Sequence, residues 1–131
     1  MLSRDTKVHL AALGFAFGGL VVAHIAGVLP HSDAGTFGAL ILFYGIVFGG
    51  AHFYLAVKGE DGLIPVASRW RYITMLVIFI ATGVAIFAIG EVTVLGIELA
   101  TIGLILIAIT MVSYILVEST AGYRATQTPR Q

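Results

Sequence analysis

Five ionisable side chains lie within or beside the apolar stretches of this 131-residue chain: His9, His24, His31, His52 and Glu98. Imidazole and carboxylate groups bind transition metals, imidazole ligates haem iron, and both groups exchange protons with quinones. An ionisable side chain at membrane depth costs about 2.5 kcal/mol or more. Each of the five is therefore a candidate functional residue.

The depth of each histidine in its helix decides which of them can share a ligand. His9 is expected near the membrane face at which the first helix begins. Counted at about 1.5 Å per residue, His24 lies roughly 22 Å above that level, and His52 lies about 7–8 Å above the same face. His24 and His52 then differ by roughly 16 Å in depth and are not expected to share a metal. His9 and His52 are the candidate haem ligands, but a depth difference of about 6 Å disfavours a haem b between them. The plainer interpretation is that His52 hydrogen-bonds across a helix interface while His9 reaches the lipid headgroups.

A second candidate site lies toward the opposite face, where His24 and Glu98 are each expected one or two turns below the surface. His31 lies in the turn above them. Histidine and carboxylate together can hold a divalent metal or exchange protons with a quinone headgroup. The plainer interpretation makes Glu98 an interfacial acid that reaches back to water. Neither haem b nor a quinone is the favoured cofactor.

Other chemistries find little support in the sequence. The chain has no cysteine, which excludes disulfides, thiolate ligands and thiol catalysis. Below Glu98 the same helix face carries Ile102, Ile105 and Ile109 and no acid, so a proton path across the membrane is disfavoured. No catalytic motif is present, and we expect a protein that is not an enzyme.

The composition determines the kind of element that must position these residues. Hydrophobic residues make up 59% of the chain, charged residues 11%, and the mean hydropathy is +1.02. A soluble domain carries about 25% charged residues. Four charge-free runs (8–32, 34–57, 72–90 and 99–117) approach or exceed the roughly 20 residues that cross a bilayer as a helix. These facts exclude a soluble enzyme, a nucleic-acid binder and a secreted disulfide scaffold.

We therefore predict an all-α integral membrane protein, with a single domain over residues 1–131. Asp5 or Thr6 is expected to cap the first helix, and Lys58-Gly59 to end the second. The first run exceeds the roughly 7–15 residues of a signal-peptide core, so we expect it to be a retained span. Short connections favour antiparallel neighbours and an up-down-up-down bundle. The expected spans are 8–29, 36–57, 72–90 and 93–117, followed by a polar tail, 118–131.

The distribution of charge predicts the orientation. The seven basic residues fall before the first span, between the second and third, and after the fourth. The other two connections carry Asp33 and Glu91 but no Lys or Arg. Because basic residues near span ends stay cytoplasmic, we expect a multi-pass protein of the plasma membrane with both termini in the cytoplasm.

Sixteen glycines, about twice the usual frequency of roughly 7%, indicate close helix packing. Such residues let helix backbones approach within lipid, either inside this chain or against another chain. The glycines expected at packing faces are Gly14, Gly18, Gly38, Gly45 and Gly49.

The leading hypothesis is a non-catalytic helical subunit of a larger prokaryotic membrane complex, with a respiratory or redox complex as the expected setting. Small four-helix subunits of such complexes share this format, an analogy of shape that transfers no residue roles. The polar tail has too few apolar residues to fold alone, so an ordered tail would indicate a partner. Two alternatives remain: a haem b- or quinone-binding electron-transfer module, and a self-assembling membrane protein. The expected partners are the bilayer and other membrane subunits or copies of this chain, and no nucleic acid.

Overall fold

The computed structural model describes residues 2–59 and 61–127 and is mostly helical, at 81%. Four of its helices are long and apolar enough to cross a membrane, by length and composition. The predicted class is confirmed as a mostly helical chain with four helices that are long and apolar enough to span a membrane.

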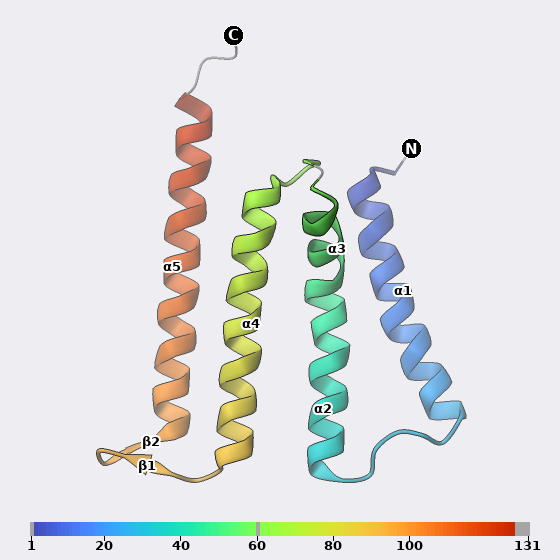
Figure 1. The fold of residues 1–131 in the computed structure, drawn as a ribbon, viewed down its shortest axis with the longest axis vertical. Helices are drawn as coiled ribbons and strands as arrows, with labels where there is room; N and C mark the ends of the chain where they lie inside the picture. Colours follow the sequence, from blue (N-terminus) through green and yellow to red (C-terminus); the bar gives the residue numbers. More distant parts are fainter. Residues whose placement is uncertain (1, 60, 128–131) are drawn as a thin grey trace. The chain divides into compact units, whose positions relative to one another are not determined.

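The chain divides into two compact units, Met1–Ile73 and Thr74–Gln131. The first contains α1 (Arg4–Ile25), α2 (Asp33–Tyr44), the π-helix η1 (Gly45–Gly50) and α3 (Ala51–Lys58). In this unit α1 runs antiparallel to the continuous segment formed by α2, η1 and α3 (Figure 1). A two-helix hairpin of this kind brings the first residues of α1 beside the last residues of α3.

Helix α1 begins one turn earlier than expected because Ser3 caps it. The backbone N–H of Thr6 donates to Ser3 Oγ over 3.1 Å, and Ser3 has extended backbone angles. Serine at this position satisfies one of the free N–H groups of the first turn. The prediction that Asp5 or Thr6 is the cap is therefore wrong. The Asp5 carboxylate remains available for contacts outside its helix.

The second span contains one full π-helical segment, which the sequence analysis did not predict. A π-helix hydrogen-bonds i to i+5, so it accommodates one residue more per turn than an α-helix. Gly45, Gly49 and Gly50 lie in this segment, where their low helix propensity weakens ordinary α-helical geometry. The span then ends as predicted at Lys58-Gly59, because Gly59 adopts the left-handed conformation with φ 66°.

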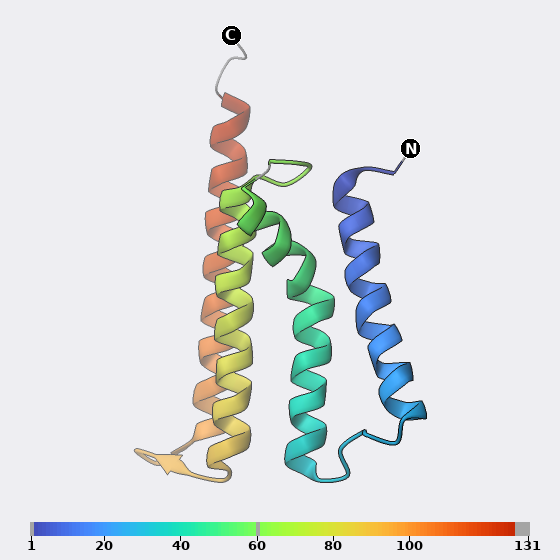
Figure 2. The same cartoon turned by 45° about the vertical axis from the view of Figure 1, so that its right-hand side comes forward.

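Helix α4 (Val66–Ile89) begins in the first unit and continues into the second. The second unit also contains the strands β1 (Thr93–Val94) and β2 (Ile97–Glu98), and α5 (Leu99–Gln127). The prediction that a helix begins at residue 93 is wrong, since a β-hairpin occupies residues 93–98 (Figure 2). Leu95 and Gly96 have φ values of 53° and 81°, the pair of positive angles that a two-residue type I′ hairpin turn requires.

Helix α5 continues to Gln127, ten residues past the predicted end of the last span at Val117. A helix that is already formed adds residues at little cost, which explains why Glu118 to Gln127 are helical. The last part of the predicted tail, residues 128–131, lies outside the described residues. Within the second unit, α5 lies against α4 at Gly103, where a Cβ atom would lie 2.5 Å from Ile86 Cδ1 of α4.

Candidate functional site

A cluster of polar side chains lies at the end of the first unit where α1 begins. Its first component is an ion pair between Asp5 of α1 and Arg69 of α4. Arg69 Nη2 donates to Asp5 Oδ2 over 2.9 Å, and the Arg69 side chain has no exposed surface. A buried guanidinium is tolerated only when a counter-charge accompanies it, so this pair ties the start of α4 to the start of α1.

The loop between α3 and α4 closes over the same carboxylate. The backbone N–H of Leu63 donates to Asp5 Oδ2 over 2.8 Å. A Cβ atom at Gly62 would lie 2.7 Å from both carboxylate oxygens of Asp5, so only glycine lets the loop approach this closely. Asp5 thus contacts two segments that follow it by about sixty residues in the sequence.

His9 lies one turn after Asp5 and is oriented by the backbone. Its Nδ1 is 2.8 Å from the Asp5 carbonyl oxygen. A carbonyl can only accept, so Nδ1 carries a proton and donates it. In the neutral ring, Nε2 therefore keeps its lone pair. A backbone carbonyl in this role is the usual means of orienting a histidine that ligates a metal.

His52 of α3 faces His9 across the helix interface. The two Nε2 atoms are 3.5 Å apart, and the rings meet edge to face with centroids 5.0 Å apart. The expected depth mismatch between these two histidines is therefore wrong. Depth had been counted from an assumed helix start at Val8, whereas α1 begins at Arg4, and both side chains reach across the interface. His9 is half-buried at this contact, and its position relative to the lipid headgroups stays a prediction.

The cluster contains polar atoms that have no partner among the described residues. His52 Nδ1 is buried without a hydrogen bond, as are Arg69 Nε and Nη1. The Tyr72 ring of α4 covers His52, with centroids 4.5 Å apart. Buried polar groups are nearly always satisfied by protein, water or a ligand, so these atoms mark a place where a small polar species fits the chemistry.

The distance between the Nε2 atoms of His9 and His52 determines whether the two imidazoles could ligate one metal ion. Two metal–nitrogen bonds of about 2.0–2.1 Å separate the nitrogens by roughly 4.0–4.2 Å when collinear, and by roughly 3.3–3.4 Å at a tetrahedral angle. The observed 3.5 Å is longer than an ordinary hydrogen bond, which spans about 2.7–3.2 Å. The two rings are in contact, with centroids 5.0 Å apart, so a haem between them would require the two helices as well as the side chains to separate.

The residues of the second predicted site belong to different units of the chain, His24 and His31 to the first and Glu98 to the second, so this site stays a prediction. His24 is exposed in the last turn of α1, and His31 is exposed in the connection between α1 and α2. Glu98 is exposed in β2 and precedes the helix in which it was expected. No group of three or more His, Cys, Asp or Glu residues within the described ranges is arranged to hold a metal ion.

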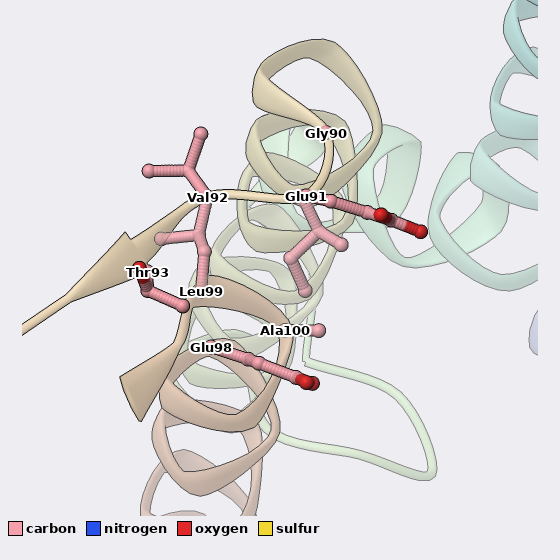
Figure 3. A pocket seen from close by; sticks show the side chains of 8 residues that line it. Gly90, Glu91, Val92, Thr93, Glu98, Leu99 and Ala100 are labelled. Atoms are coloured by element: carbon pink, nitrogen blue, oxygen red, sulfur yellow. The ribbon is translucent and has the colours of Figure 1, made fainter. Parts of the chain in front are cut away.

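Glu98 instead lines a pocket of about 550 Å³ beside the β-hairpin. Figure 3 shows the Glu91 and Glu98 side chains extending to the same side of the hairpin. Both side chains are exposed, and the interpretation of Glu98 as an acid that reaches water stays a prediction.

The predicted packing glycines have different surroundings. A Cβ atom added at Gly14, Gly18 or Gly38 would meet no atom of the described residues within 4 Å. Gly49 is buried within η1. A Cβ atom at Gly50, which was not in the predicted set, would lie 3.9 Å from Ala12 Cβ of α1. Packing of Gly14 and Gly18 against another chain stays a prediction.

Asp5, Arg69 and Tyr72 were not predicted from the sequence as site residues, and Asp5 was expected only as a helix cap. One signal was available. Asp5 is the only acidic residue in a basic lead-in, and an isolated acid among cations suggests a tertiary partner. Comparison with known proteins adds no assignment, since no family model, curated protein or solved structure matches this chain.

Proposed function

We propose that this chain is a non-catalytic helical subunit of a larger membrane complex in a prokaryotic plasma membrane. It packs against other membrane subunits or copies of itself, with both termini in the cytoplasm. The observation that supports the proposal is a glycine face of α1 that the first unit leaves uncovered. Gly14 and Gly18 each lie two residues from the buried Ala16, which places them roughly 200° around the helix from it. The two glycines are therefore nearly opposite the face on which α1 contacts the second span.

Small residues on an otherwise lipid-facing helix surface are the usual means by which membrane helices approach one another. On α1, large apolar side chains lie beside these glycines, with Phe15 72% exposed and Phe17 53% exposed. The two phenylalanines flank the glycines on either side and so form a groove into which a second helix can pack. The proposal requires that this face is covered in the assembled state.

The test is purification in a mild detergent, with the mass of the resulting particle measured by mass photometry. We expect the wild-type chain to elute in a larger assembly. The double variant Gly14→Leu/Gly18→Leu should release a monomer. Gly83→Leu is the matched control, because it alters another span glycine with no neighbour within 4 Å. Disassembly by the control as well, or a wild-type monomer, would contradict the proposal. A particle that contains only this chain would favour the self-assembling alternative.

A second candidate function is an electron-transfer module, favoured by the contact between His9 and His52. These two imidazoles would hold a haem b, and the haem would supply one-electron transfer when bound. The Asp5 carbonyl would fix the His9 tautomer, and Tyr72 would restrict the His52 ring. A quinone beside His24 and Glu98 stays a prediction without a geometric argument.

Absorbance spectroscopy of the purified protein tests this candidate. A Soret band that is lost in His9→Ala and in His52→Ala, and retained in His24→Ala, would support it. The absence of any Soret band after expression with a haem precursor would remove haem from consideration.

A further inference from the structure

An apolar groove runs along the seam between α1 and the second span, on one side of their contact. Its hollow nearest the start of α1 has a volume of about 420 Å³ and is lined by both helices. The lining side chains include Lys7, Ala11, Ala12 and Phe15 from α1, and Ile46 and Tyr54 from the second span. A second hollow of about 250 Å³ continues beyond Phe15 and Ile46, which line both.

The groove has the length and lining of an acyl-chain site. From Lys7 to Phe15 the helix rises about 12 Å, close to half of the roughly 30 Å hydrocarbon core, which is the depth of one leaflet. Its walls are almost entirely apolar, as an acyl chain requires. This hollow is distinct from the polar cluster, since neither His9 nor His52 lines it.

One end of the groove is cationic. Lys7 lines the hollow and is exposed, and Lys58 Nζ lies 5.8 Å from the centroid of the Tyr54 ring, which also lines it. The nearest acid on α1, Asp5, is already bound to Arg69. Two lysines at the polar end of an apolar groove match a lipid that has an anionic headgroup and an apolar tail.

We propose that this groove binds one anionic phospholipid, with an acyl chain between α1 and η1–α3 and the phosphate between Lys7 and Lys58. Basic pockets between membrane helices commonly hold anionic headgroups. The proposal does not depend on the subunit function. It requires only that the first two spans lie in a bilayer.

Native mass spectrometry of the full chain released from nanodiscs tests the proposal. The nanodiscs contain equal amounts of phosphatidylglycerol and phosphatidylcholine with the same acyl chains. We expect one phosphatidylglycerol per chain to be retained, with at least a fivefold preference over phosphatidylcholine. Each of Lys7→Gln and Lys58→Gln should weaken the preference roughly fivefold, the factor that corresponds to about 1 kcal/mol per basic residue. Arg124→Gln, at the end of α5, should leave the preference unchanged.

Filling the groove tests the acyl-chain part of the site. Ala11→Phe should abolish retention of phosphatidylglycerol, whereas Ala108→Phe, at an exposed position of α5, should have no effect. Circular dichroism in detergent confirms that each variant is folded. Equal retention of the two lipids by the wild type would overturn the proposal, as would full retention by Ala11→Phe.

Because the chain has no cysteine, a single Ala11→Cys variant also reports the occupant directly. Disulfide-linked dimers that form without bound lipid would show that a second copy fills the groove, and would likewise overturn the proposal. Free glycerophosphate should not displace the bound lipid, since it lacks the acyl chain on which the site depends.

Discussion

Arg69 Nη2 and Asp5 Oδ2 form a 2.9 Å ion pair between the first turn of α1 and the first turn of α4, across 64 positions of sequence. The arginine is fully buried. Around this pair lie the Gly62 loop, the His9–His52 contact and Tyr72, so the pair organises the polar end of the first unit. Its removal should therefore affect more than one element.

Asp5→Asn should lower the free energy of unfolding by about 3 kcal/mol, because it leaves the buried Arg69 guanidinium without a counter-charge. The double variant Asp5→Asn/Arg69→Met removes both charges and should cost less than the sum of the two single variants. Denaturant titration of the detergent-solubilised protein, followed by circular dichroism, measures both. Strictly additive single-variant costs would show that the two side chains are not coupled.

Gly62→Ala should destabilise the protein by about 1–2 kcal/mol, since the new Cβ would displace the loop and break the Leu63 N–H hydrogen bond to Asp5. The same substitution in an Asp5→Ala background should cost little, because the carboxylate that it would contact is gone. The comparison uses the same unfolding titration. An equal loss of stability in both backgrounds would show that the cost of Gly62→Ala does not come from its contact with Asp5.

Deletion of Val47 should be tolerated, because removing one residue from η1 converts the π-helix to an α-helix and keeps the faces on either side in register. Deletion of Leu40 from α2 is the matched control. It rotates one end of the span by about 100° relative to the other and should separate His52 from His9. Thermal unfolding should show a small change for the first deletion and a large one for the second. Equal losses would argue against the π-helix.

Gly103→Ala and Gly83→Ala should have opposite effects on stability. At Gly83 a Cβ meets nothing within 4 Å, so the better helix propensity of alanine should stabilise the protein by about 0.5–1 kcal/mol. At Gly103 the Cβ would lie 2.5 Å from Ile86 Cδ1 and 3.1 Å from Thr82 Cγ2, and we expect a net loss of about 1 kcal/mol. Stabilisation by both variants would mean that α4 and α5 are not packed at Gly103.

A green fluorescent protein fused after Gln131 should fluoresce, whereas alkaline phosphatase at the same position should be inactive, because the basic segments are expected to hold both termini in the cytoplasm. Fusions placed after Asp33 should show the reverse pattern. An active phosphatase after Gln131 would require an odd number of crossings or the opposite orientation.

The composition and the spacing of charges were sufficient to predict the four apolar helices and the end of the second span at Gly59. A long apolar run in lipid must satisfy its backbone hydrogen bonds within itself, so its helical structure can be predicted from local sequence. The β-hairpin at residues 93–98 was missed because Val92, Val94 and Ile97 are as apolar as a span. Only the positive φ angles at Leu95 and Gly96 distinguish it from a helix start.

The polar cluster was decided by tertiary structure. From the sequence alone, His9 and His52 were candidates separated in depth, and Asp5 and Arg69 were two charges near different span ends. Their meeting depends on a one-turn shift in the start of α1, caused by Ser3, and on how two helices face each other. Neither the start of α1 nor the faces at which the two helices meet follows from composition or hydrophobic periodicity. The sequence by itself determined that the chain has four helices long and apolar enough to cross a membrane. Side-chain packing between distant segments determined which few polar groups could act together.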